Sequence, residues 1–288
     1  MKRIVGVHGI GQSRTSKEQL TRDWSGALDR GLGAAGAPTL PPGTLELPHW
    51  TRLLARPGKH LGPDDDPFDS EVPLGDGEAD FVTRALEDVV PREDLDRIGE
   101  SESQTLGPPQ LWPARLTRLV MAYDLRFPRG GGRLFVSAMR EVRFYLYEPG
   151  LAARVRALVA EAFDADTAVV VGHSLGSVIA YDLLRREEIA PDRASGVRTL
   201  LTCGSPLAVP SVRRGLGIAD GEPMGLPGGT GWVNVFDPGD VVTGGGGLGG
   251  LGPGITDERV NNGIGDPHSA ARYLQSGPVA RVIADGCR

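Results

Sequence analysis

Cysteine is scarce in this chain, and its two cysteines lie far apart. Among 288 residues only Cys203 and Cys287 occur. Their number and spacing fit neither a disulfide framework nor a metal site. Cys203 stands in an apolar run, where a buried cysteine packs as a small hydrophobic residue. We therefore expect a reduced protein without disulfide bonds.

Long hydrophobic runs are absent as well. The sequence has no stretch of about 18 apolar residues, so we expect no transmembrane segment. The basic start Met1-Lys2-Arg3 is followed by only four residues before His8, too few for the core of a signal peptide. These absences predict a cytoplasmic location. The net charge of −6 argues against nucleic acid as a main partner.

The overall composition is that of a globular protein, with 40% hydrophobic and 24% charged residues. Short apolar runs alternate with stretches of helical spacing. We expect strands near residues 2–7, 44–47, 168–171, 197–203 and 232–236. We expect helices near residues 16–32, 79–90, 111–123, 134–147, 151–163, 177–186 and 269–284. This alternation predicts an α/β fold with a mainly parallel sheet and helices on both faces.

Two stretches depart from this alternation. Residues 52–109 are dense in proline, glycine and acidic residues, and only 79–90 have a helical pattern there. We predict a long, loop-rich and mobile segment. The glycine-rich residues 244–254 lack the Gly-Lys-Ser/Thr of a phosphate-binding loop, so a flexible loop is expected. The interpretation is one domain, 1–288, with an insertion at about 51–149.

The most informative motif is Gly172-His173-Ser174-Leu175-Gly176. It has the form of a nucleophile elbow, and a buried strand before it and a helix after it are the context that this turn requires. We expect the glycines to allow a turn in which side chains two positions from the serine would collide. The turn lifts the serine oxygen above the sheet edge, next to a helix N-terminus. Ser174 is therefore the predicted nucleophile.

A serine nucleophile needs a base, and the base needs an acid that orients it. In this fold the chain order is Ser, then Asp or Glu, then His. His268 is the only histidine after Ser174 and is the predicted base. Asp240, inside the turn after residues 232–236, is the preferred acid. Asp237, which directly ends that strand, is the alternative, and the other aspartate is expected to cap the turn. Weaker candidates, which no predicted strand delivers, are Asp257, Glu258 and Asp266.

The oxyanion of an acyl-transfer intermediate needs two backbone donors. One is the amide of Leu175, directly after the nucleophile. The other is expected in the loop after the first strand, where glycine lets the backbone approach a substrate. Ile10 is the preferred second donor, and Gly9 and Gly11 are the alternatives.

These motifs resemble the α/β-hydrolase family, in its lipase and serine-esterase branch. The residues that carry the resemblance are His8-Gly9, the stretch VVVGHSLGSVIAYD, CGSPL at 203–207, DPGDVV at 237–242 and His268. They cover about residues 2–13 and 151–271. The resemblance implies an α/β-hydrolase fold in which residues 51–149 form a lid or cap. Residues 255–267 make a poor strand, so the last sheet edge is expected to be short or missing. The family's usual two strands before the oxyanion loop are also expected to be absent.

The predicted function is hydrolysis of an ester by a serine hydrolase, a carboxylesterase or lipase-like enzyme, with a small-molecule or lipid-like acyl substrate. No metal or organic cofactor is implied. A thioesterase, an amidase or an acyltransferase would use the same triad. A further alternative is a non-catalytic interaction protein that kept the fold. Against it stands the presence of all three triad residue types in order. The sequence does not indicate the oligomeric state.

Overall fold

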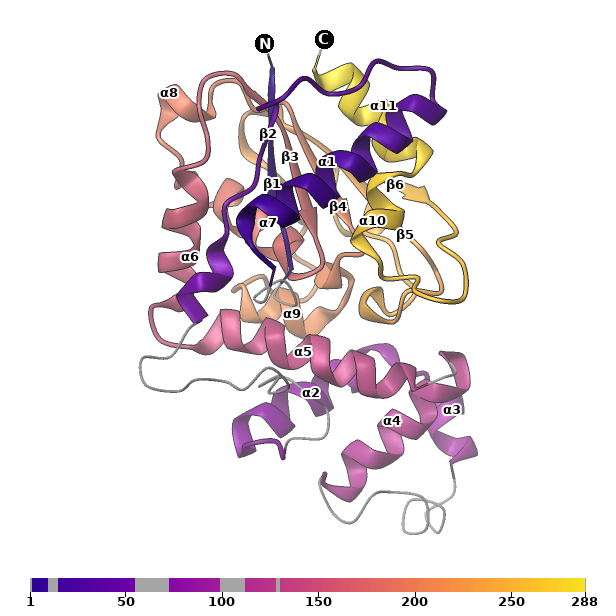
Figure 1. The fold of residues 1–288 in the computed structure, drawn as a ribbon. Coiled ribbons are helices and arrows are strands. Elements are labelled where there is room, and N and C mark those ends of the chain that lie inside the picture. Colours follow the sequence, from indigo (N-terminus) through magenta and orange to yellow (C-terminus); the bar gives the residue numbers. More distant parts are fainter. Residues whose placement is uncertain (1, 10–14, 55–72, 99–111, 128–129, 288) are drawn as a thin grey trace.

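The computed structural model describes residues 2–9, 15–54, 73–98, 112–127 and 130–287. Within them six strands form one sheet in the order β2-β1-β3-β4-β5-β6, and every neighbouring pair is parallel. The strands are β1 (Arg3–Val7), β2 (Leu45–Glu46), β3 (Thr167–His173), β4 (Thr199–Cys203), β5 (Gly231–Phe236) and β6 (Ile255–Arg259). Their carboxyl ends point downward in Figure 1. The predicted α/β class with a parallel sheet is confirmed.

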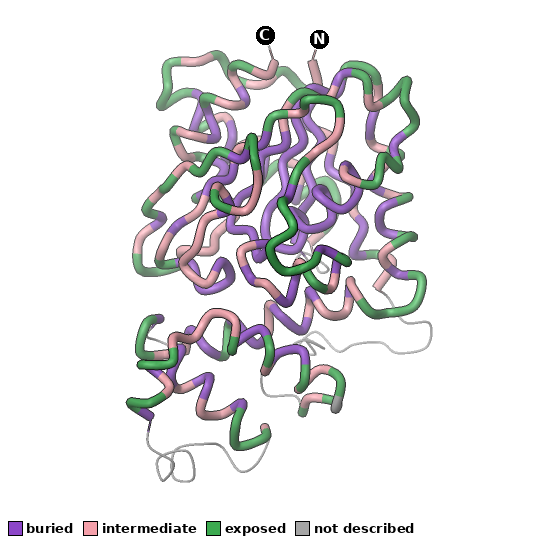
Figure 2. Tube along the Cα trace, turned by 180° about the vertical axis from the view of Figure 1, so that it is seen from behind, coloured by how far each residue is buried: buried purple, intermediate pink, exposed green. Residues whose placement is uncertain are grey.

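Helices cover both faces of the sheet, and this explains why its central strands are apolar throughout. In β1, Ile4 packs into one hydrophobic cluster and Val5 into the other. In β3, Val169 and Val170 divide in the same way, because neighbouring side chains in a strand point to opposite faces. All seven residues of β3 are buried, and Figure 2 shows the central strands buried.

The helices agree with most of the predicted ranges. One face carries α1 (Lys17–Ala34), α10 (Ala270–Leu274) and α11 (Gly277–Gly286), and the other carries α6 (Leu151–Ala160) and α7 (Leu175–Arg185). The remaining helices are α2 (Asp76–Val89), α3 (Arg92–Arg97), α4 (Ala114–Arg126), α5 (Gly131–Tyr147), α8 (Pro191–Ala194) and α9 (Pro210–Gly215). Ser16 caps α1, since its hydroxyl accepts a hydrogen bond from the Gln19 amide at 3.2 Å.

The single helix predicted over residues 269–284 is wrong, because the structure has two helices there, α10 and α11. The chain between them is extended at Ser276, with φ −72° and ψ 152°. Pro278 follows in the first turn of α11. A proline ring blocks helix continuation on its N-terminal side but suits the first turn of a new helix.

The expectation of a short or missing last edge is also wrong. β6 pairs in parallel with β5 over five residues, from Trp232 opposite Ile255 to Phe236 opposite Arg259. Only Ile255 is buried in this strand. Edge strands pair on one side alone and commonly carry charged side chains. The strand is therefore held by its backbone pairing, and its polar sequence gives no apolar pattern from which a strand could be predicted.

Helices α2, α3, α4 and α5 form a layer below the carboxyl edge of the sheet (Figure 1). They pack on one another, and α5 also contacts the turn at Val241–Thr243. The helix expected near 79–90 is confirmed as α2, whereas α3 was missed. Half of the segment 52–109, for which mobility was predicted, consists of residues 55–72 and 99–109, which lie outside the described residues.

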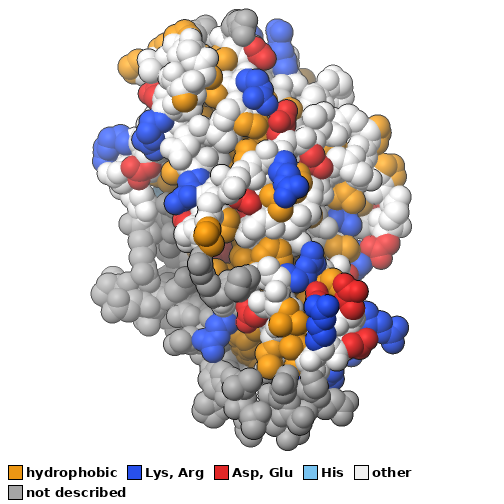
Figure 3. All heavy atoms as spheres, turned by 90° about the vertical axis from the view of Figure 1, so that its right-hand side faces the viewer, with side chains coloured by type: hydrophobic (Ala, Val, Ile, Leu, Met, Phe, Trp, Pro, Cys, Tyr) orange, Lys and Arg blue, Asp and Glu red, His pale blue; other side chains and the backbone are white. Residues whose placement is uncertain are grey.

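The surface carries both signs of charge. On the face in Figure 3, basic and acidic side chains are interspersed, and hydrophobic side chains gather in small groups among them. In the part of the chain that the structure describes, none of the helices has the length and hydrophobicity to span a membrane.

Candidate active site

The predicted site residues lie where the sheet connections diverge. From β1 the chain passes through α1 on one face to β2, whereas from β3 it passes through α7 on the other face to β4. The carboxyl ends of β1 and β3 therefore border the crevice in which open α/β sheets bind ligands. Gly9 and Ser174 meet there, because a Cβ atom on Gly9 would lie 3.2 Å from the Ser174 Cβ.

Ser174 occupies a strained turn between β3 and α7. Its backbone has φ 55° and ψ −131°, a region that non-glycine residues rarely adopt and that is found at functional sites. The Ser174 amide donates to the Cys203 carbonyl at 3.1 Å. The Ser174 carbonyl accepts from both the amide and the hydroxyl of Ser177, at 2.9 and 2.6 Å. Hydrogen bonds on both sides of the residue thus hold the strained conformation.

The two glycines of the motif allow close backbone approaches. A Cβ on Gly172 would lie 2.8 Å from the Gly176 carbonyl oxygen and 2.5 Å from the Ser177 Cα. A Cβ on Gly176 would lie 1.9 Å from the Val7 carbonyl oxygen. The first glycine therefore lets α7 fold back on β3, as expected. The second is required by the neighbouring strand β1, which the sequence argument did not foresee.

The structure brings Ser174, His268 and Asp240 into one chain of hydrogen bonds. His268 Nε2 lies 2.9 Å from Ser174 Oγ, and His268 Nδ1 lies 2.8 Å from Asp240 Oδ2. A carboxylate only accepts, so Nδ1 carries the proton and Nε2 is left to accept from the serine hydroxyl. Asp240 is fully buried, whereas the His268 side chain is 26% exposed. This arrangement can activate a serine oxygen.

Asp237, the alternative acid, faces away from His268. Its Oδ1 accepts from the Gly239 amide at 2.7 Å, which is the turn-capping role expected for the other aspartate. Its Oδ2 accepts from the Asn262 amide. Asp237 therefore ties the turn after β5 to the loop that leads to His268. Within the described ranges, the weaker candidates Asp257, Glu258 and Asp266 form no hydrogen bond with the His268 ring, whose nitrogens pair with Ser174 and Asp240. Asp257 instead accepts from the Leu248 and Gly249 amides, so the glycine-rich stretch is held at that point.

Three further residues surround the histidine, and sequence reasoning gave none of them a role. His173 Nε2 donates to the His268 carbonyl at 2.8 Å. Tyr273 Oη donates to Asp240 Oδ2 at 2.8 Å. Gly204 has φ 56°, and a Cβ there would lie 2.9 Å from Asp240 Oδ2 and 3.1 Å from His268 Nδ1. His173 lies within the elbow motif and Gly204 within the CGSPL stretch, but no local pattern marks Tyr273.

Burial and hydrogen bonding set the charges of this cluster. Burial acts to raise the pKa of Asp240, but the imidazole of His268 and the hydrogen bonds from His268, Tyr273 and Val242 outweigh it and hold the pKa below its usual value. Burial, with a smaller contribution from His268, lowers the pKa of His173 to about 3. Asp240 is therefore charged and His173 neutral at neutral pH, which suits an acceptor and a donor respectively.

The predicted oxyanion donors are only partly described. Leu175 is the first residue of α7, so its amide has no partner within the helix and is available to a ligand. Ile10 and the alternative Gly11 lie outside the described residues. The other alternative, Gly9, is described and lies next to Ser174, since a Cβ on Gly9 would be 3.2 Å from the Ser174 Cβ.

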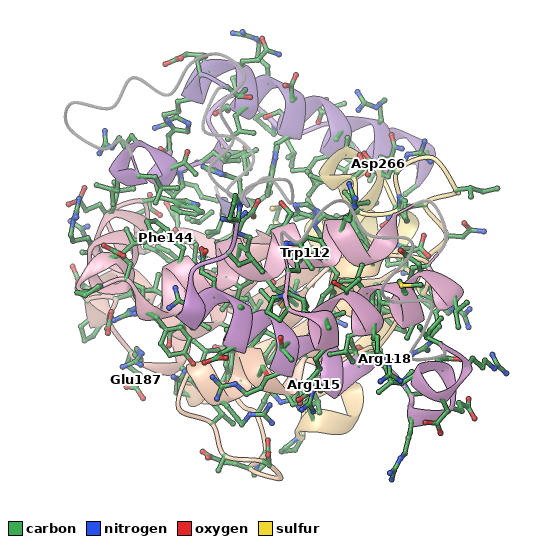
Figure 4. All side chains as sticks on the ribbon, turned by 90° about the horizontal axis from the view of Figure 1, so that it is seen from below. Trp112, Arg115, Arg118, Phe144, Glu187 and Asp266 are labelled. Atoms are coloured by element: carbon green, nitrogen blue, oxygen red, sulfur yellow. The ribbon has the colours of Figure 1, made fainter. Side chains whose placement is uncertain are left out.

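A cavity of about 510 Å³ opens at Ser174 and His268. This volume is in the range of small-molecule sites. α1 and α5 form two of its walls, and its apolar lining includes Leu20, Trp24, Leu134, Ala138, Val241 and Val242. It is also lined by Asp23, Glu141 and Asp266. Figure 4 views the molecule from below and labels Asp266 in the loop that leads to His268, between α1 and α5.

The described aromatic residues between positions 50 and 112 all pack against the core. Trp50 is buried; its Nε1 donates to the His8 carbonyl at 2.9 Å, and its ring stacks on that histidine. Phe81 is buried in the core cluster. Phe68 lies outside the described residues, and Trp112 is half-buried against the core. Packing is therefore the role that the structure gives to the described members. Within the described ranges no group of three or more His, Cys, Asp or Glu residues could hold a metal ion.

Comparisons with protein-family models, with curated proteins and with solved structures find no match for this chain.

Proposed function

We propose that this protein is a serine hydrolase with an α/β-hydrolase fold, acting on carboxylic esters through Ser174, His268 and Asp240. The observation that carries the proposal is the hydrogen-bond chain from the serine hydroxyl through His268 to Asp240, with distances of 2.9 and 2.8 Å, at a strained strand-to-helix turn. A protein that serves only as a scaffold has no need for a strained serine that is hydrogen-bonded to a histidine–aspartate pair.

In the proposed reaction Ser174 Oγ attacks the ester carbonyl carbon while His268 Nε2 takes the hydroxyl proton. The Leu175 amide and a donor from the loop after β1 stabilise the oxyanion. The intermediate then collapses, and His268 returns the proton to the departing alcohol. Water attacks the acyl-enzyme by the same route, and the carboxylic acid leaves. Asp240 orients the imidazole and stabilises its positive charge in both halves of the reaction.

The cavity favours esters with an apolar acyl or alcohol group of limited size. Its apolar lining from α1, α5 and the turn after Asp240 offers burial for such a group, at about 25 cal/mol for each Å² removed from water. The carboxylates of Asp23, Glu141 and Asp266 line the same cavity, so a negatively charged substrate would meet like charges there.

The test is hydrolysis of p-nitrophenyl esters with acyl chains from acetate to palmitate. Purified protein is expected to hydrolyse at least the short and medium chains, and Ser174→Ala is expected to reduce the rate to background. A protein that hydrolyses none of these esters, or a Ser174→Ala variant as active as the original, would contradict the proposal.

A further inference from the structure

Tyr273 lies behind the proposed acid, on α10, five residues after His268. Its side chain is completely buried. The hydroxyl lies 2.8 Å from Asp240 Oδ2 and 2.9 Å from the Asp237 backbone nitrogen. One hydroxyl thus contacts both ends of the turn at 237–240, which follows β5.

The direction of both hydrogen bonds is fixed by their partners. The Asp237 amide can only donate, so the tyrosine oxygen accepts there. The Asp240 carboxylate can only accept, so the tyrosine proton points to Oδ2. Burial and the neighbouring Asp240 charge raise the pKa of Tyr273, which keeps this proton on the phenol. Oδ2 therefore has two donors, Tyr273 Oη and His268 Nδ1.

We propose that Tyr273 is a positioning residue of the triad: its hydroxyl fixes the Asp240 carboxylate toward His268 and takes up part of the negative charge that the imidazole would otherwise meet. This inference rests on the proposed function for its kinetic consequences, although the hydrogen bonds exist in the resting protein. It distinguishes Tyr273 from a residue that only fills the core.

The remaining hydrogen bonds of the Asp240 carboxylate should keep it in place if the Tyr273 hydroxyl is removed. Oδ1 accepts from the Val242 amide at 2.9 Å. His268 remains a donor to Oδ2. Loss of the tyrosine hydroxyl should therefore leave the carboxylate bonded to His268, but with more of its charge directed at the ring and with greater freedom of rotation.

Among the described residues, the buried titratable groups that face this cluster are uncharged at neutral pH. Tyr123, from α4, keeps its phenol proton because burial and the nearby Asp240 charge raise its pKa. His173, from the end of β3, has its ring centroid 4.7 Å from that of His268 and stays neutral, with its pKa lowered by burial. Cys203, from β4, is buried, which raises the pKa of its thiol. His8 is neutral as well, since burial lowers its pKa to about 4. The cavity-lining carboxylates described above are Asp23, Glu141 and Asp266.

The chain offers a matched control at Tyr145 on α5. This tyrosine is also buried, and its hydroxyl donates to a buried carboxylate, Asp182 Oδ2, at 3.1 Å. That pair lies between α5 and α7 and touches none of the triad residues. Tyr145→Phe therefore removes the same kind of hydrogen bond with the same change of volume, but away from the site.

The experiment compares Tyr273→Phe and Tyr145→Phe with the unmodified protein. For Tyr273→Phe we expect kcat on a p-nitrophenyl ester to fall about tenfold with KM within twofold, since the hydroxyl orients the acid rather than the substrate. The acid limb of the kcat/KM profile should move to higher pH by about half a unit, because the imidazole now meets a less shielded carboxylate. Tyr145→Phe should change neither quantity. A kcat within twofold of the original, or an acid limb that stays in place or moves to lower pH, overturns the inference.

A second measurement separates this inference from the proposed function. The imidazole titration of His268 is followed by NMR in the resting protein, with His268→Asn used for assignment. We expect the midpoint to rise in Tyr273→Phe even if no ester is hydrolysed, and an unchanged or lower midpoint overturns the inference. If Tyr273→Phe does not fold, 3-fluorotyrosine at this position keeps the ring and makes the phenol a stronger donor. The midpoint of the His268 titration should then fall, and an unchanged midpoint would overturn the inference.

Discussion

The nucleophile and the base of the proposed triad are held by two different kinds of structure. Ser174 follows a fully buried strand, and backbone hydrogen bonds and glycine contacts fix its conformation. His268 lies in a loop outside any strand, and side chains hold it: His173 bonds to its carbonyl and Asp240 to its ring. Backbone geometry that only glycine permits is visible in a sequence. A loop held by side chains from distant positions leaves no such pattern.

The largest expected effects come from removing the nucleophile or the base. His268→Ala should lower kcat/KM for ester hydrolysis almost as far as Ser174→Ala, by about a million-fold where triad members act as a unit. The His268 loop is partly exposed, so the variant should stay folded. Turnover of the same ester by both variants, with folding checked by circular dichroism, tests this. An alanine variant that keeps 1% of the activity would show that His268 is not the base.

The two aspartates of the turn after β5 should respond differently to the same substitution. Asp240→Asn leaves an amide in contact with Nδ1 and favours the wrong imidazole tautomer, which costs about ten-thousand-fold in serine proteases. Asp237→Asn replaces one of the two accepting oxygens with an NH₂ group, which cannot accept a hydrogen bond from the backbone amide opposite it. The variant should therefore lose about 1–3 kcal/mol of stability but keep most of the activity of the folded protein. Steady-state kinetics and urea unfolding of both variants provide the comparison. The opposite kinetic pattern would move the acid to Asp237.

The close backbone contacts made by the glycines around Ser174 should affect the free energy of unfolding. Gly176→Ala places a Cβ against the Val7 carbonyl of β1, and we expect a loss of about 3 kcal/mol or more in the free energy of unfolding. Gly33→Ala is the matched control, because that glycine is in α1 with nothing within 4 Å of the added Cβ. It should stabilise the protein by about 0.5–1 kcal/mol. Equal effects in urea unfolding would show that the elbow contacts do not limit stability.

The smallest effect is the pH dependence of stability from the buried histidines. Burial lowers the pKa of His8 to about 4 and that of His173 to about 3. The unfolded chain binds protons at these residues below about pH 6.5, whereas the folded protein does not, so stability falls as pH falls below 6.5. Each histidine should account for about 1.4 kcal/mol between pH 7.5 and 5.5.

His8→Asn should remove this share of the pH dependence, whatever its effect on stability at pH 7.5. Urea unfolding of both proteins at pH 7.5, 6.5 and 5.5 gives the two slopes. Parallel slopes would mean that His8 is protonated in the folded protein.

Much of the fold could be predicted because its central strands are continuous apolar runs and its main helices have regular spacing. β6 could not, because an edge strand with one buried side chain looks polar in the sequence. The break between α10 and α11 depends on Pro278, whose effect the helical spacing masked. At the site, the sequence contained the residue types and their order. It left Asp240 and Asp237 open because only the folded turn shows which carboxylate reaches His268. Tyr273 could not be foreseen, since an aromatic residue at helical spacing is usually part of the core.

Covalent labelling of the serine tests the central claim most directly. A fluorophosphonate reacts with a serine only when a neighbouring base activates it. Incubation with this probe followed by peptide mass spectrometry should place a single adduct on Ser174, and His268→Ala should abolish it although the serine is still present. A protein that takes up no label, or a label on another serine, would contradict the assignment of Ser174 as an activated nucleophile.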